Sequence, residues 1–120
     1  MLLIYNDETR WDSLGEAEMG EVMKRYGDFT AELRASSAMI AGDRLQPTAN
    51  ATTVRVRDGE QLVTDGPFAE TKEQLGGYYL IEVETLDEAL EWARKIPGAR
   101  LGSIEVRPVL PVGAPAEAAS

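Results

Sequence analysis

The chain has 120 residues, 43% of them hydrophobic, which suits a single domain with a buried core. Its net charge of −9 opposes direct binding to nucleic acid and to anionic membranes. It contains no cysteine, no histidine and no calcium-loop pattern, so we expect neither a metal site nor a cofactor. No signal-peptide pattern and no long apolar run is present, so the expected protein is soluble and cytoplasmic.

The first predicted elements are a strand, a helix and a second strand. Residues 1–5 are apolar enough for a short buried strand, and residues 6–10 form a polar break. Apolar residues then recur at helical spacing from a cap at Ser13 to about Ala35, which predicts one long amphipathic helix. A second strand is expected over residues 38–41, where a Gly-Asp pair follows it.

An antiparallel hairpin is predicted next. Asp58-Gly59 separates two alternating runs, residues 52–57 and 60–64, and this dipeptide is a strong signal for a two-residue turn. Such a turn fixes the register, so that Arg57 faces Glu60, and it places one set of side chains on a common face: Val54, Val56, Val63 and Asp65. A carboxylate at the end of a valine-lined face is expected to find hydrogen-bond donors or to titrate abnormally.

The remaining elements complete an α+β pattern. Residues 77–84 predict a strong strand, a capping box at Thr85 opens a second helix, and residues 103–107 predict the last strand. The order β-α-β, hairpin, β-α-β is typical of a ferredoxin-like two-layer sandwich with one antiparallel-rich sheet. We expect residues 1–108 to form this domain and the Pro/Ala-rich residues 109–120 to form a flexible tail.

The two faces of the predicted sheet differ in character. One face is apolar and suits a covering of helices; it carries Val54, Val56, Ile81, Val83, Ile104 and Val106. The other face mixes charged and aromatic side chains, and it is either solvated or packed against a second copy with a polar cavity between the sheets; it carries Arg55, Arg57, Tyr78, Leu80, Glu82, Glu105 and Arg107.

Residues 65–79, Asp-Gly-Pro-Phe-Ala-Glu-Thr-Lys-Glu-Gln-Leu-Gly-Gly-Tyr-Tyr, link two predicted strands and are called the DGPF segment below. Connections of this kind collect binding and catalytic groups because rigid strands hold them. The segment resembles the DGPF-type branch of the YCII-related protein family. The resemblance covers nearly the whole chain except the tail, and it extends to Leu2–Tyr5, Ala51–Arg55, Ala89–Ala93, Ile96–Arg100 and Ile104–Pro108.

The resemblance implies a dimeric α+β barrel, in which the sheets of two ferredoxin-like subunits face each other. It also implies a function that is not settled for the family. Some smaller relatives carry a His/Asp pair proposed as an enzymatic site, which a chain without histidine cannot reproduce. DGPF-type members are often encoded beside extracytoplasmic-function sigma factors, which suggests a regulatory setting.

The candidate site residues lie in the DGPF segment and on the first strand. Asp65 is the candidate catalytic residue, as a general acid/base or as an anchor for a cationic group, although Asp before Gly-Pro also forms turns for structural reasons alone. The candidate ligand-binding residues are Tyr5, Phe68, Glu70, Lys72 and Tyr78. For these the structural alternatives are a core anchor, solvated surface charges and a dimer contact. For Gly76-Gly77 we expect a bulge or a close backbone approach rather than a phosphate loop.

Two hypotheses about function stay open at this point, so the sequence leaves undecided whether the protein is an enzyme. In the first, a small enzyme without a cofactor acts on a small organic molecule in a cavity near the DGPF segment. In the second, the protein is a non-catalytic module that binds a ligand or another protein, in a sigma-factor-linked regulatory setting. Both hypotheses include a homodimer.

Overall fold

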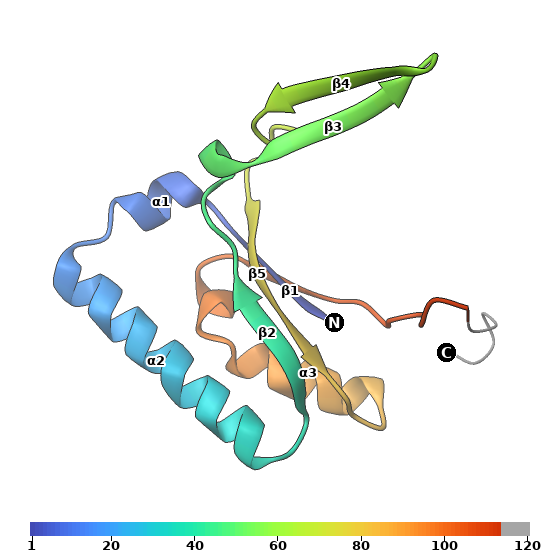
Figure 1. The fold of residues 1–120 in the computed structure, drawn as a ribbon. Helices are drawn as coiled ribbons and strands as arrows, with labels where there is room; N and C mark the ends of the chain where they lie inside the picture. Colours follow the sequence, from blue (N-terminus) through green and yellow to red (C-terminus); the bar gives the residue numbers. More distant parts are fainter. Residues whose placement is uncertain (114–120) are drawn as a thin grey trace.

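The computed structural model describes residues 1–113 (Figure 1). Its helices and strands follow in the order β1 (Leu2–Asn6), α1 (Glu8–Asp12), α2 (Glu16–Ala35), β2 (Met39–Arg44), β3 (Thr52–Arg57), β4 (Glu60–Asp65), β5 (Gln74–Ile81), α3 (Leu86–Lys95) and β6 (Ser103–Val106). Two 3₁₀ turns, η1 (Thr48–Asn50) and η2 (Pro97–Arg100), complete the set. Within the described range, every helix is too short or too polar to traverse a bilayer.

The main sheet has four antiparallel strands in the order β2-β5-β1-β6, and α2 and α3 pack on one of its faces. This arrangement confirms the predicted ferredoxin-like α+β fold. Side chains alternate along β1, so that Leu2 and Ile4 are buried beneath the helices. Phe29 of α2 lies at the centre of the core, edge-on to Tyr79 of β5 and to Trp92 of α3, with ring centroids 5.2 and 6.0 Å apart.

The opposite face of the sheet has no helix over it and is called the open face. Leu3 pairs with Tyr78 on one side and with Glu105 on the other, and alternation adds Tyr5 and Leu80 to the same surface. The mixed face predicted for the sheet is therefore present in part, without Arg55 and Arg57, which lie on β3 outside this sheet, and residues 1–113 do not cover it.

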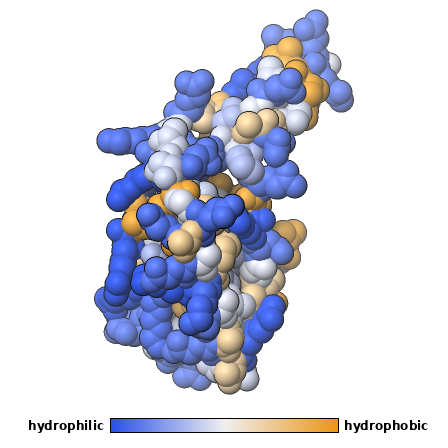
Figure 2. All heavy atoms as spheres, turned by 90° about the vertical axis from the view of Figure 1, so that its left-hand side faces the viewer, coloured by the Kyte–Doolittle hydropathy of each residue, from blue (hydrophilic) through white to orange (hydrophobic). Residues whose placement is uncertain are grey.

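The β3–β4 hairpin has the predicted register, with Arg57 opposite Glu60 and Val54 opposite Val63. Asp58 and Gly59 both have positive φ, 52° and 79°, as a two-residue hairpin turn of the I′ type requires. The expectation of a single sheet is wrong, however, because the hairpin forms a separate two-stranded sheet that projects from the body (Figures 1 and 2).

This separation overturns the predicted helix cover of the hairpin valines. Val54, Val56 and Val63 are 61%, 57% and 61% exposed, whereas Ile81, Val83, Ile104 and Val106 of the same predicted face do pack against the core. Alternating valines showed that one face of the hairpin is apolar, but they could not show which surface, if any, covers it.

The region before the long helix also differs from the prediction. The supposed polar break contains α1, because the carboxylate of Asp7 accepts the N–H of Thr9 at 3.0 Å and caps a five-residue helix. Ser13 ends this helix instead of starting the next, and its hydroxyl donates to the carbonyl of Arg10. Helix α2 begins after Gly15 and ends at Ala35 as predicted.

The boundaries of two strands also differ from the prediction. β2 continues through the Gly-Asp pair to Arg44, because Gly42 leaves room for the Tyr79 ring: a Cβ at Gly42 would lie 2.7 Å from that ring. β5 begins at Gln74 and ends at Ile81, three residues earlier than predicted at each end. The Thr85 half of the capping box is confirmed, since the Thr85 hydroxyl accepts the N–H of Glu88 at 3.2 Å, whereas the Glu88 carboxylate accepts the N–H of Glu84 instead of that of Thr85. Residues 114–120 of the predicted tail lie outside the described residues.

Candidate functional site

The front of the DGPF segment lies at the base of the hairpin. Asp65 is the last residue of β4 and is exposed, while Gly66 turns the chain with a φ of 96°. Backbone groups fasten this turn to β3, since the Gly66 carbonyl accepts the Thr53 hydroxyl at 2.8 Å and the Phe68 carbonyl accepts the Arg55 guanidinium at 3.1 Å. The backbone at the front of the segment therefore forms the turn and holds it against β3.

The candidate side chains of this segment do not converge on one site in the chain described here. Phe68 is 78% exposed, and Glu70 and Lys72 are exposed on the connection from β4 to β5. Tyr78 lies on the open face, where its hydroxyl donates to the Asp43 carboxylate at 2.8 Å. This hydrogen bond raises the pKa of Tyr78 because it stabilises the protonated phenol. The roles assigned to these residues stay predictions.

The Gly76-Gly77 pair serves both purposes expected of it. Gly76 is the extra residue of a β-bulge, because Ile4 pairs with Gly77 and Tyr5 pairs with Leu75. Gly77 allows a close backbone approach, since a Cβ there would lie 3.0 Å from the carbonyl oxygen of Asp43. The end of the DGPF segment therefore brings β2 and β5 tightly together.

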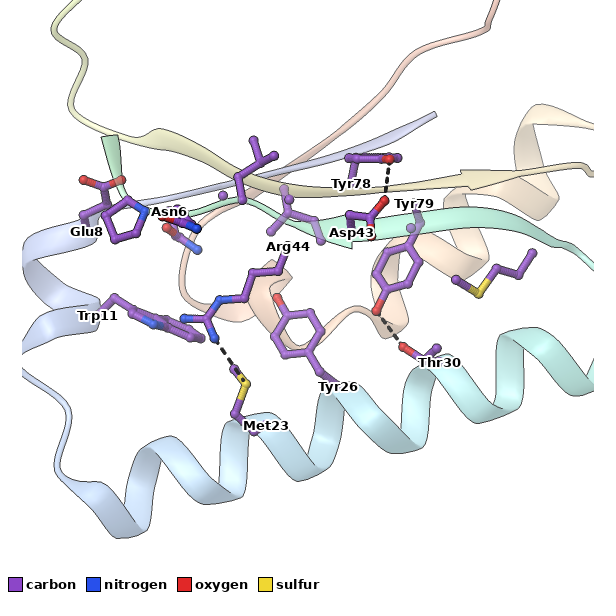
Figure 3. A pocket seen from close by; sticks show the side chains of 18 of the residues that line it. Asn6, Glu8, Trp11, Met23, Tyr26, Thr30, Asp43, Arg44, Tyr78 and Tyr79 are labelled. Carbon is purple, nitrogen blue, oxygen red and sulfur yellow. Dashed lines mark hydrogen bonds between the residues drawn. The ribbon is translucent and has the colours of Figure 1, made fainter. Parts of the chain in front are cut away.

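A cavity of about 290 Å³ lies on the helix side of this junction, between α1, α2, β2 and β5 (Figure 3). Its wall is largely apolar and aromatic, with Ile4, Trp11, Met23, Tyr26, Met39 and Tyr79. A few polar side chains complete it, among them Asn6, Glu8, Thr30, Arg44 and Gln46. Apolar walls with few polar groups are typical of small-molecule sites. Of the predicted site residues only Tyr78 belongs to the lining, and its hydroxyl points away toward Asp43.

Two tyrosines of the cavity wall are fixed by hydrogen bonds. The Tyr26 hydroxyl accepts the N–H of Gly98 at 3.1 Å, and the hydroxyls of Tyr79 and Thr30 share a hydrogen bond of 2.7 Å. Burial raises the pKa of Tyr26 because the phenolate would lose its hydration. At neutral pH this phenol is therefore protonated, and it serves as a wall and a hydrogen-bonding group.

The charged groups of the cavity come from α1, from β2 and, with Arg34, from the end of α2. The Glu8 carboxylate accepts both the N–H and the hydroxyl of Thr48 at 2.8 Å, which fastens η1 to α1. The Arg44 guanidinium lies 5.7 Å from the centroid of the Trp11 ring and donates to the sulfur of Met23 at 3.7 Å. Among residues 1–113 no group of three or more His, Cys, Asp or Glu side chains is arranged to hold a metal ion.

Apart from Tyr78, sequence reasoning missed the residues that line this cavity. Tyr26 lay within the predicted long helix, Trp11 followed the supposed polar break, and Arg44 lay beyond the expected end of the second strand. The tryptophan within a polar stretch was the one available signal, because a large aromatic side chain there needs a surface to pack on.

Comparison with known proteins identifies the family of the chain. The family model of the YCII-related domain matches residues 1–113. An uncharacterised protein of Rhizobium meliloti (strain 1021) is 43% identical over 110 residues, which cover 90% of this chain and 89% of that protein. The match to the family model agrees with the resemblance seen in the sequence at the level of the YCII-related family. The chain therefore belongs to the YCII-related family.

Proposed function

We propose that this protein binds a small organic molecule, without transforming it, in the cavity between α1, α2, β2 and β5. The observation that carries this proposal is the cavity itself, about 290 Å³ of space walled by Trp11, Met23, Tyr26 and Tyr79. Ligand pockets in proteins occupy roughly 300–1,000 Å³ and combine apolar walls with a few placed polar groups. A volume at the lower end of this range suits a compact ligand.

Binding is favoured over catalysis because Glu8 and Tyr26 of the cavity are already engaged, and Asp12, the other carboxylate that α1 contributes to the lining, is exposed to solvent. A catalytic base must come within hydrogen-bond reach of the proton that it removes. The Glu8 carboxylate is engaged by Thr48, and the phenol of Tyr26 is held protonated by burial. Asp65, the candidate catalytic residue, is exposed at the end of β4 and does not line the cavity.

The enzyme hypothesis therefore requires an assembly in which a second subunit brings Asp65 to a bound ligand. It predicts that Asp65→Asn abolishes the turnover of a bound molecule while its affinity is retained. The binding hypothesis predicts that no bound molecule is converted by the wild-type protein. Product analysis by mass spectrometry on each bound molecule separates the two hypotheses.

The cavity can be tested with a fragment library and ligand-observed NMR. Met23→Trp fills the cavity, and we expect it to abolish binding of fragments that bind the wild-type protein. Met19→Trp is the matched control, since Met19 lies on the same helix, is also partly buried and does not line the cavity. The proposal fails when no fragment binds the wild type, or when fragments bind the Met23 variant equally well.

We also propose that the protein is a homodimer, and two uncovered surfaces support this. The open face presents Leu3, Tyr5, Tyr78 and Leu80, and the hairpin presents its valines to solvent. An isolated two-stranded hairpin is marginally stable in water, so an apolar hairpin of this kind gains from a partner surface. A monomer in sedimentation analysis at micromolar concentration would contradict the proposal.

A further inference from the structure

We infer that the ligand of the cavity is a small monocarboxylate with an apolar body, whose carboxylate binds to Arg44. This inference rests on the proposed function of the cavity and adds the chemical class of its ligand. Arg44 ends β2 on the helix side of the sheet, and Figure 3 shows it with Asn6 and Trp11 at one end of the cavity.

The positive charge of Arg44 is not neutralised by the described residues. The ion pairs formed within residues 1–113 use Lys24, Arg25, Arg94, Lys95 and Arg107. The nearest partners of the Arg44 guanidinium are the Trp11 ring and the Met23 thioether, which is a weak acceptor. Most of its N–H donors are therefore available to a ligand.

None of the carboxylates that line the cavity forms an ion pair with Arg44. Glu8 is held by Thr48, and the Asp43 carboxylate is held by Tyr78 on the open face. Asp12 lines the cavity but forms no ion pair with Arg44. A guanidinium in this position repels cationic ligands and matches a carboxylate through two parallel hydrogen bonds.

A second polar group faces the same end of the cavity. The half-buried Asn6 side chain makes no hydrogen bond to residues 1–113 and lies beside the Gly76 bulge, where a Cβ would come within 3.3 Å of its amide nitrogen. Its amide can donate to a carboxylate oxygen or accept from a ligand N–H. Asn6 and Arg44 thus form one polar end opposite the apolar wall.

The charge around the cavity favours a monoanion over a phosphate. Three carboxylates lie in the lining, those of Glu8, Asp12 and Asp43, against the two guanidinium groups of Arg34 and Arg44, and the chain carries a net charge of −9. A dianion would meet this negative field with one guanidinium at its end of the cavity, whereas a monocarboxylate needs no second cation. The apolar wall then takes the hydrocarbon or aromatic part of the ligand.

The test uses three probe pairs that differ only in charge: benzoate, phenylacetate and hexanoate, each with its primary amide. Dissociation constants are measured by NMR titration of the full-length protein, and the indole N–H of Trp11 reports binding at the cavity. We expect each carboxylate that binds the wild type to bind roughly ten- to hundredfold more tightly than its amide, because hydrogen bonds to a charged group are stronger.

Arg44→Gln should remove this preference, so that each carboxylate and its amide bind the variant with similar affinity. Arg10→Gln is the matched control, because it removes the same charge from the neighbouring helix without altering the cavity lining, and it should keep the preference. Dispersed amide spectra of both variants show that each is folded.

Three results would overturn the inference. The first is equal binding of carboxylates and amides by the wild type, the second is a preference that the Arg44 variant keeps, and the third is a preference that the Arg10 variant loses to the same extent. In these cases neutral molecules still bind at the cavity and the proposed function stands. If neither charged nor neutral probes bind and the fragment library is also negative, the proposed function fails with it.

Discussion

Gly98→Ala should lower the stability of the fold through a clash with the hydroxyl of Tyr26, so that its effect depends on whether that hydroxyl is present. A Cβ at Gly98 would lie 2.5 Å from the Tyr26 hydroxyl oxygen, whereas the next contacts, Ile4 Cγ2 at 3.4 Å and the Tyr26 ring at 3.8 Å, are ordinary packing distances. The clash is therefore with one oxygen atom. Moving that oxygen also disturbs its hydrogen bond to the Gly98 N–H.

The expected magnitudes follow from two opposing effects. Overpacking costs about 1–3 kcal/mol, and replacing glycine by alanine at a compatible φ recovers about 0.4–1 kcal/mol through the unfolded chain. We expect Gly98→Ala to lower the free energy of unfolding by about 1–2 kcal/mol. Tyr26→Phe alone should cost about 1–3 kcal/mol, because the buried N–H of Gly98 loses its acceptor.

In the double variant the clash is absent, so Gly98→Ala should be neutral or slightly stabilising beside Phe at position 26. The coupling energy should then be about 1–3 kcal/mol in a double-mutant cycle measured by urea denaturation. Gly20→Ala is the control: nothing lies within 4 Å of its added Cβ, and we expect a gain of about 0.5–1 kcal/mol on the exposed helix. The reasoning would be refuted if the effects of Gly98→Ala and Tyr26→Phe on the free energy of unfolding added to within about 0.5 kcal/mol.

Three further predictions concern pH, helix capping and assembly. Burial raises the pKa of Tyr26, so the unfolded tyrosine loses its proton first and stability should fall as the pH rises above about 10; Tyr26→Phe should flatten this fall in urea titrations at alkaline pH. Thr85→Ala removes the acceptor for the Glu88 N–H and should cost about 1 kcal/mol, with no loss under Thr85→Ser. Val54→Lys should shift sedimentation toward monomer when a second copy covers the hairpin, whereas Leu86→Lys, at a similarly exposed position on α3, should leave the sedimentation unchanged.

The sequence carried enough information for the local structure of the hairpin and for the order of the main elements. The register followed from the Asp58-Gly59 turn because a two-residue loop leaves one way to pair the strands. The bulge and close approach at Gly76-Gly77 followed in the same way, from residues without a side chain in a strand. Each of these features depends on neighbours in the chain.

The features that escaped prediction depend on tertiary contacts. Helix α1 has five residues, too few for a periodic pattern, and the side chain of Asp7 caps it. The cavity needs Trp11, Tyr26 and Arg44, which come from three elements and show no common spacing in the sequence. For the same reason the sequence could not show whether the exposed candidate residues of the DGPF segment have a role beyond forming the turn.

The projecting hairpin is fastened at its base to α1, which also lines the cavity. Its incoming connection contains Thr48, which the Glu8 carboxylate of α1 holds by two hydrogen bonds at 2.8 Å. On the outgoing side, the Gln74 side chain accepts the N–H of Glu8 at 3.0 Å, so both connections of the hairpin are held by Glu8. A molecule that shifts α1 on entering the cavity would therefore tilt the hairpin. Ligand occupancy and the presentation of the valine face would then be linked, each altering the free energy of the other.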